Sequence, residues 1–138
     1  MAETAGYSGT PLVKKLGIKE GFQISLIGEP DDYLNMLTGL PGKVKIHKNL
    51  NHSDLDMVHL FVNSRGVLEE VLGTAKRAIK KSGIIWASWP KKASGMPTDL
   101  TENMIRELAL ESGLVDVKVC AIDEIWSGLK LVYRLKDR

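Results

Sequence analysis

The pattern of hydrophobic and polar residues predicts that strands and helices alternate along the chain. Residues 57–62 form an almost unbroken apolar run, as in a central strand that is covered on both faces. After this run, hydrophobic residues recur every three or four positions from Leu68 to Ile79, which predicts an amphipathic helix. Residues 84–89 form the next apolar run. Two strands joined by one helix should be parallel neighbours with a right-handed crossover.

Helix boundary signals lie on both sides of this unit. Thr10 can cap a short first helix, with Pro11 at the first helical position. Asn63 or Ser64 can cap the helix after residues 57–62, and Gly83 can end it in the left-handed conformation. Further elements are predicted as a first strand at 22–27, a short helix after Asp32, an edge strand at 44–47 and a helix capped by Thr101.

The last two strands are predicted from strict alternation of apolar and polar residues at 115–121 and 129–135. The connection between them, residues 123–128, is too short for a parallel crossover, so the two strands should form an antiparallel hairpin. The complete order predicts an α/β fold with an open, doubly wound, mostly parallel sheet, helices on both faces and a C-terminal antiparallel hairpin. We expect one Rossmann-like domain over residues 1–138.

Composition and charge narrow the classes of function. The 138 residues are 43% hydrophobic, which is enough for a core of their own. The formal charge of +2 is too small to attract nucleic acid or an anionic membrane by its overall field, so we expect neither as a partner. The single cysteine, Cys120, excludes an intrachain disulfide, and the first residues lack a secretory signal, so we expect a cytoplasmic protein.

Ligands of an open α/β sheet bind beyond the carboxyl ends of the parallel strands. Four predicted loops should meet at that edge, namely residues 28–32, 63–66, 90–98 and 123–128. They carry cations, hydroxyl groups, an acid and a tryptophan side chain. The candidate ligand-binding residues are therefore Lys91, Lys92, Ser94, Gly95, Trp126, Ser64 and Asp123.

The chemistry of these residues suits a small anionic ligand or an acidic protein partner. Lys91 and Lys92 can supply charge, backbone amides at Ser94 and Gly95 can donate hydrogen bonds, and Trp126 can form a flat apolar wall. The alternative is a solvated loop whose lysines pair with surface acids. No catalytic residue, metal ligand set or cofactor signature emerges. His59, within an apolar run, is interpreted as a hydrogen-bonded core residue.

The predicted topology resembles the closing half of class I methyltransferases. That family has a glycine-rich turn after its first strand, where this chain has the sequence GEPDD at 28–32. It also has an acid after its second strand that holds ribose hydroxyls, where this chain has Lys45, His47 and Lys48. We therefore expect that S-adenosylmethionine does not bind.

Several unusual motifs also resemble a bacterial family of uncharacterised proteins, a domain of unknown function. The resemblance implies no activity or ligand for any position, so a non-catalytic, small-ligand-binding or regulatory domain is the leading hypothesis. A small methyltransferase-like enzyme and a nucleic-acid accessory protein that uses the basic stretch 43–52 are the alternatives. The motifs are GYSGTPL at 6–12, KLGIK at 15–19, HLFV at 59–62, SWPKKASG at 88–95, VKVCA at 117–121 and WSGLKL at 126–131.

Overall fold

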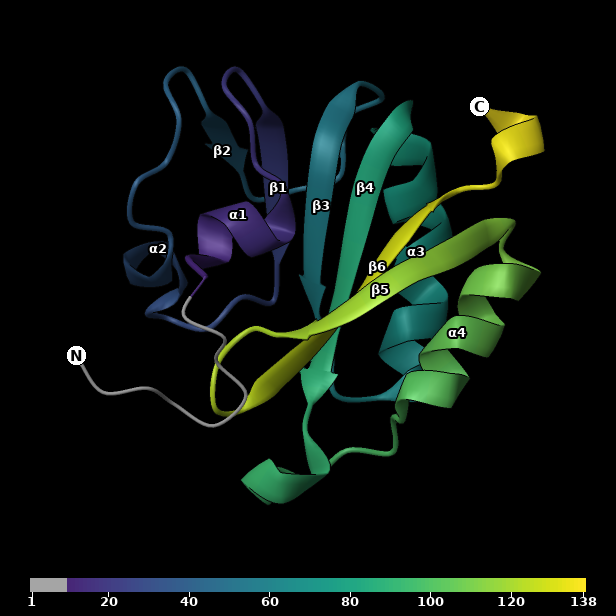
Figure 1. Cartoon of the computed structure of the whole chain (residues 1–138). Coiled ribbons are helices and arrows are strands. Elements are labelled where there is room, and N and C mark those ends of the chain that lie inside the picture. Colours follow the sequence, from purple (N-terminus) through teal and green to yellow (C-terminus); the bar gives the residue numbers. More distant parts are fainter. Residues whose placement is uncertain (1–9) are drawn as a thin grey trace.

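Six strands form one mixed sheet in the order β2-β1-β3-β4-β6-β5 (Figure 1). The computed structural model describes residues 10–138. The first nine residues lie outside this range. They include most of the motif at 6–12 and the stretch that was predicted to lack a secretory signal. In chain order the elements are α1 (Leu12–Leu16), β1 (Gln23–Ile27), α2 (Tyr33–Met36), β2 (Lys45–His47), β3 (Leu55–Phe61), α3 (Arg65–Ala78), β4 (Ile79–Pro90), the 3-10 turn η1 (Lys92–Ser94), α4 (Glu102–Glu111), β5 (Leu114–Ala121), β6 (Trp126–Tyr133) and the 3-10 turn η2 (Leu135–Asp137).

The pairing of the strands confirms the predicted fold class. β2, β1, β3 and β4 are mutually parallel, while β6 is antiparallel to both β4 and β5. The returning strand β6 therefore lies between β4 and β5. The parallel pair of β3 and β4 and the terminal antiparallel hairpin are both confirmed. β2 lies at one edge of the sheet, as its short, lysine-containing sequence predicts.

Two hydrophobic layers lie on the two faces of the sheet. Helices α3 and α4 cover one face, and α1 stands before the other face on the side of β1 and β3 (Figure 1). Because side chains alternate along a strand, Trp86 joins the layer beneath α1 and Trp89 joins the layer beneath α3 and α4. Trp86 is fully buried, and its Nε1 donates to the carbonyl oxygen of Leu16 at 3.0 Å, which joins α1 to the sheet.

Two predicted helix boundaries are wrong. Pro11 occupies the cap position of α1 with an extended ψ of 144° and no side-chain cap, so the helix begins one residue later than predicted. α3 ends at Ala78, and β4 begins directly at Ile79 because that residue already pairs with Leu55 of β3. Gly83 is thus a strand residue. A Cβ there would lie 2.8 Å from the Ile79 Cβ, so the glycine permits close packing and does not end the helix.

The other helix caps follow the sequence. The Ser64 hydroxyl accepts from the Val67 amide at 3.2 Å, and the Thr101 hydroxyl accepts from the Met104 amide at 3.2 Å. Both residues satisfy an amide of the first helical turn. No helix within residues 10–138 combines the length and the apolar character that crossing a membrane requires.

Candidate functional site

A hollow of about 750 Å³ opens between the loop after β4 and the first turn of α4. Its volume lies within the range of roughly 300–1,000 Å³ that is typical of small-molecule sites. We call it the α4 pocket. Its lining combines aromatic, aliphatic and proline side chains with two lysines, hydroxyl groups and one acid, namely Trp89, Pro90, Lys91, Lys92, Gly95, Met96, Pro97, Thr98, Leu100, Thr101, Glu102 and Ser127.

The loop that bears the two lysines is held by hydrogen bonds of its own. The Ser94 hydroxyl donates to the Lys91 carbonyl at 2.7 Å and accepts from the Met96 amide at 3.2 Å. Gly95 follows with φ of 76°, the left-handed conformation that glycine adopts most easily. The Thr98 hydroxyl donates to the Asn63 carbonyl at 2.8 Å and fixes the far end of the loop to the end of β3. The lysines are therefore presented from a defined turn.

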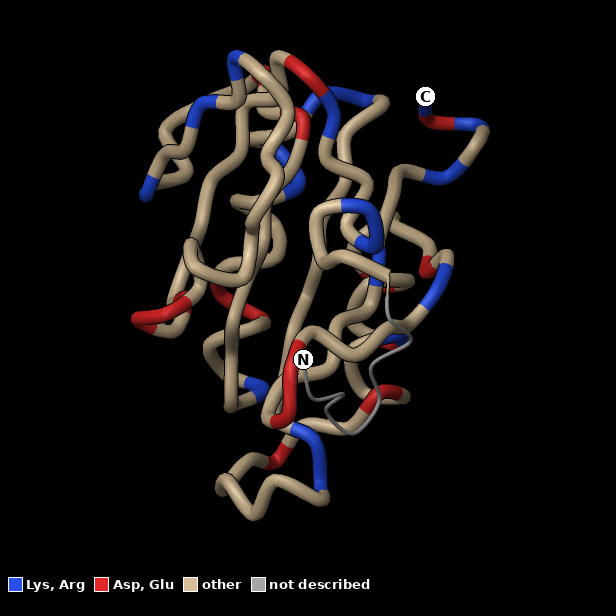
Figure 2. Tube along the Cα trace, turned by 60° about the vertical axis from the view of Figure 1, so that its left-hand side comes forward, with Lys and Arg blue, Asp and Glu red and all other residues tan. Residues whose placement is uncertain are grey.

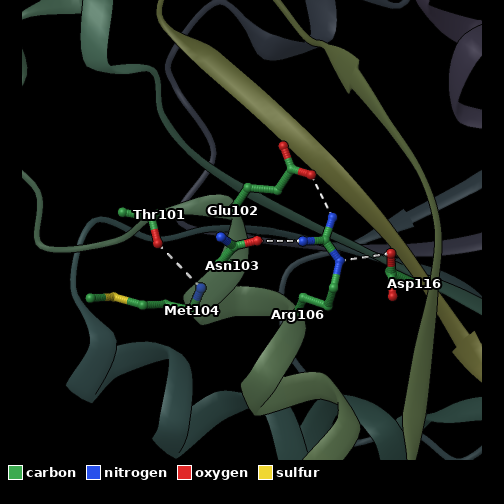
Figure 3. A network of polar contacts seen from close by, with 6 residues as sticks. All are labelled: Thr101, Glu102, Asn103, Met104, Arg106 and Asp116. Carbon is green, nitrogen blue, oxygen red and sulfur yellow. Dashed lines mark hydrogen bonds and ion pairs between the residues drawn. The ribbon is translucent and has the colours of Figure 1, made fainter.

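An arginine clamp holds the other wall of the pocket in place (Figure 3). Arg106 of α4 donates from Nε to the Asp116 carboxylate of β5 at 3.0 Å and from Nη1 to the Asn103 side chain at 2.7 Å. Its Nη2 also pairs with the Glu102 carboxylate. The hydrogen bonds to Glu102 and then to Asp116 raise the pKa of the Arg106 guanidinium. The clamp fixes the first turn of α4 against β5.

The electrostatic balance of the pocket is cationic. Lys91 and Lys92 stand on one side, and Glu102 is the carboxylate among the lining residues. Because Glu102 is engaged by Arg106, much of its charge is compensated within α4. The floor is apolar, since Trp89 and Leu100 are 7% and 4% exposed. An apolar floor beneath two ammonium groups suits an amphipathic anion.

The structure brings three of the predicted site residues to this pocket and gives Ser94 a different role. Lys91, Lys92 and Gly95 line the pocket, whereas the Ser94 side chain folds the loop. The predicted use of backbone amides is corrected: the Ser94 amide donates to the Lys91 carbonyl at 3.0 Å and the Gly95 amide to the Lys92 carbonyl at 3.3 Å. The 3-10 turn consumes both donors.

The remaining predicted residues do not line the α4 pocket and instead stabilise the fold. Ser64 caps α3, and the Asp123 carboxylate accepts the amides of Ile125 and Trp126, both at 2.8 Å, in the hairpin turn. Trp126 is 9% exposed and packs edge-on against Phe61 with ring centroids 5.1 Å apart, in the layer beneath α1. The hairpin does lie beside the lysine loop, because the Lys91 amide donates to the Ile125 carbonyl at 2.7 Å.

Several residues that line the α4 pocket were not predicted from the sequence. Trp89 supplies the flat wall that was assigned to Trp126, and Thr101 and Glu102 contribute the first turn of α4. The alternation of side chains along a strand could have indicated Trp89, because it places this residue on the opposite face from the fully buried Trp86. The Thr101 cap was predicted, but no sequence pattern indicates that the first turn of α4 folds back to face the lysine loop across a pocket.

A second hollow, of about 160 Å³, lies at the carboxyl end of β1. Glu29 and Asp31 line it together with Lys48, which forms an ion pair with Glu29. Gly28 precedes them with φ of 74°, and a Cβ there would lie 2.5 Å from the Phe61 carbonyl oxygen. Close packing against β3 therefore explains this glycine without any ligand.

A buried chain of three polar side chains connects this region to the middle of the sheet. The Tyr33 hydroxyl bonds to His59 Nδ1 at 2.7 Å, and His59 Nε2 bonds to the Ser88 hydroxyl at 2.6 Å. The order resembles a serine nucleophile with its base and an orienting group. All three residues are at most 1% exposed, so no substrate reaches Ser88. Burial lowers the pKa of His59 to about 3. The interpretation of His59 as a hydrogen-bonded core residue is confirmed.

Residues 14–135 match the model of a family described as a protein of unknown function, DUF3052. A search of curated proteins gave no match. Among solved structures, an S-adenosylmethionine-dependent methyltransferase from Aquifex aeolicus has a TM-score of 0.64 and 15% identity, over 87% of this chain and 86% of that chain. A TehB-like methyltransferase from Corynebacterium glutamicum has a TM-score of 0.57 and 12% identity, over 89% and 85%. These likenesses show a methyltransferase-like fold.

The residues at the carboxyl end of β1 do not suit the cofactor of these neighbours. The hollow of about 160 Å³ is smaller than the roughly 300 Å³ at the lower limit of typical ligand pockets. Glu29 and Asp31 would repel the carboxylate of S-adenosylmethionine, and Lys48 is already paired with Glu29. The residues at this position therefore do not fit S-adenosylmethionine.

Proposed function

We propose that this chain, which belongs to the protein family of unknown function DUF3052, is a non-catalytic domain that binds a small organic anion in the α4 pocket. The observation that carries the proposal is the combination, in one hollow of about 750 Å³, of the Trp89 and Leu100 floor with Lys91 and Lys92. A cytoplasmic location fits the single cysteine, which allows no intrachain disulfide.

The chemistry of the pocket defines the class of ligand. Lysine ammonium groups bind carboxylates and phosphates as point charges, without the planar fork that arginine provides. Trp89, Met96 and Leu100 offer apolar contact to a ring or a short aliphatic chain. A ligand with one anionic group and a compact apolar body uses both features. An acidic protein partner could use the two lysines alone but would leave the apolar floor without contact.

The first prediction concerns the two lysines. Replacing Lys91 and Lys92 together by Ala should weaken the binding of 1-naphthoate at least about tenfold, because each hydrogen bond to a charged group contributes roughly 1.5–3 kcal/mol. Binding of 1-naphthamide, which has the same ring without the charge, should change little. Titration followed by tryptophan fluorescence reports the contact, because Trp89 lines the pocket.

A matched control uses two lysines elsewhere on the surface. The Lys43→Ala/Lys136→Ala double variant removes the same charge and should bind 1-naphthoate as the unchanged protein does. Equal losses in both double variants would show that overall charge, and not the α4 pocket, attracts the anion. An acidic peptide that binds through Lys91 and Lys92, when 1-naphthoate does not, would favour a protein partner.

The second prediction addresses the alternative of a methyltransferase-like enzyme. Calorimetric titration with S-adenosylmethionine should give no binding in the micromolar range, because acids line the small hollow beside Gly28. A dissociation constant of a few micromolar, equivalent to about −8 kcal/mol, would contradict the prediction and restore the enzyme hypothesis. Binding of 1-naphthoate tests the α4 pocket separately, so the two results are independent.

The basic stretch 43–52 gives the nucleic-acid alternative less support in the structure than in the sequence. Lys48 of the basic stretch 43–52 is engaged by Glu29. His47 bonds through Nε2 to the Gln23 side chain at 3.1 Å, and its ring lies 4.5 Å from that of His52. These contacts commit part of the stretch to local structure.

A further inference from the structure

A second group of cations lies on the sheet face that α3 and α4 do not cover. Lys118 of β5 and Lys130 of β6 stand directly opposite each other in the antiparallel pair. Their alternating neighbours, Leu129 and Leu131, pack in the layer beneath α3 and α4, so both lysines point to the other face. Like charges at directly opposed positions destabilise a sheet. The chain therefore maintains an arrangement that does not serve its own stability.

A hollow of about 330 Å³ adjoins this lysine pair. Lys130 lines it together with Lys81 and Arg138, and the valines Val117 and Val132 form apolar walls. None of its lining residues has a carboxylate side chain. The hollow begins at the amino end of β4, whereas the α4 pocket begins at the carboxyl end of the same strand, so the two sites are separate.

Lys130 joins the hollow to the lysine pair. Burial lowers the pKa of Lys130, and the positive charges of Lys118 and Lys19 lower it further. Lys19 therefore lies close enough to belong to the same group. We call Lys19, Lys118, Lys130 and Arg138 the β5–β6 cationic face.

The cations of this face are not used in ion pairs. The ion pairs found among the described residues 10–138 use other cations, among them Lys48, Arg65, Lys80, Arg106 and Arg134. Arg138 donates to the Tyr133 carbonyl at 2.9 Å, and Lys81, at the rim of the hollow, places its ammonium 4.7 Å from the centre of the Tyr133 ring in the layer beneath α3 and α4. Both contacts orient a positive charge without neutralising it.

We propose that the β5–β6 cationic face binds a polyphosphate group, either free or as part of a small molecule. A polyphosphate carries several charges on neighbouring groups and matches a row of lysines, while a single phosphate would neutralise at most two of them. Ser82 adds a hydroxyl group at the rim of the hollow. No aromatic side chain lines the hollow, so a nucleoside attached to the polyphosphate would gain no stacking contact.

The distribution of charge favours a compact anion over a long nucleic acid. Figure 2 shows that Asp and Glu gather towards the edge to which the parallel strands point, whereas the opposite edge is richer in Lys and Arg. The formal charge of the chain is only +2. A long polyanion that extended beyond the cationic face would meet the carboxylates near the opposite edge outside the α4 pocket, and they would oppose its binding.

The test uses inorganic tripolyphosphate as the probe. Calorimetric titration at low ionic strength should show saturable binding, and the Lys118→Gln/Lys130→Gln variant should bind at least about tenfold more weakly. The same variant without ligand should unfold at an equal or higher temperature, because the opposed like charges are gone. The control variant Lys43→Gln/Lys136→Gln should retain the binding.

Further probes distinguish the sources of the polyphosphate. ATP and GTP should bind within about threefold of tripolyphosphate, because the hollow does not recognise a base. The proposal is overturned if tripolyphosphate does not bind, if the control variant loses as much affinity, or if only a single-stranded oligonucleotide binds. A clear preference for ATP over both GTP and tripolyphosphate would likewise overturn it, since recognition would then lie in the base.

Discussion

Lowering the pH from 7.5 to 4.5 should reduce the free energy of unfolding by about 3 kcal/mol through His59 alone. His59 has no exposed surface, and burial lowers its pKa from an ordinary value of 6.5 to about 3. In the unfolded chain the same imidazole takes up a proton below pH 6.5. Across the whole window between the two pKa values, this difference amounts to about 5 kcal/mol.

The sign follows from the number of protons that each state binds. Between pH 6.5 and 3 the unfolded state carries a proton on His59 that the folded state does not, so stability rises with pH there. The neutral ring is favoured because burial removes the water that would solvate a charged imidazolium, and its hydrogen-bond partners, the hydroxyls of Tyr33 and Ser88, carry no charge. The contribution is complete above pH 6.5 and is lost as the pH falls towards 3.

The measurement is urea unfolding at several pH values, for the unchanged protein and for His59→Gln. Glutamine does not titrate and can still donate and accept hydrogen bonds between the two hydroxyls. Carboxylates contribute to the acid dependence of both proteins, and the difference between the two curves isolates His59. If the two proteins lose stability in parallel between pH 7.5 and 4.5, His59 is not held neutral in the fold.

The sequence predicted the sheet well because its central strands are buried on both faces. β3 and β4 are recognisable as apolar runs, and the alternation at β5 and β6 reveals a hairpin of which one face is more exposed. The end of α3 was misplaced because residues 76–81 are rich in lysine and arginine, as at the end of a helix. Pairing of Ile79 with Leu55 outweighed that local signal.

The candidate site was predicted only in part, for a different reason. Topology alone places the loop with Lys91 and Lys92 at the carboxyl edge of the sheet, and the structure puts both lysines in a pocket. The other wall of the pocket is the first turn of α4, which the contact between Arg106 and Asp116 holds against β5, and no local sequence pattern indicates this contact. Trp126 was chosen because residues 123–128 were predicted to be a loop at this edge, whereas β6 begins at Trp126 and its ring packs against Phe61.

Replacing Trp86 by Ala should destabilise the protein by about 3–5 kcal/mol, the usual cost of deleting a large buried aromatic side chain. Trp86 is fully buried between α1 and the sheet, and the substitution also leaves the Leu16 carbonyl without its indole donor. Urea unfolding measures the loss. Trp86→Phe retains most of the packing and should lose less.

Gly128 provides a sharper test of why this core has its present shape. It lies on β6 beside Trp86, and a Cβ at this position would be 3.1 Å from Trp86 Cε3, 3.0 Å from Ile122 Cδ1 and 3.1 Å from the Ser88 hydroxyl oxygen. The Trp86 indole therefore occupies space that any larger residue at position 128 would need. Gly128→Ala should destabilise the unchanged protein and cost less in the Trp86→Ala background, where the cavity relieves one of the three contacts. Equal costs in both backgrounds would mean that the indole does not dictate the glycine and that Ile122 and Ser88 alone require it.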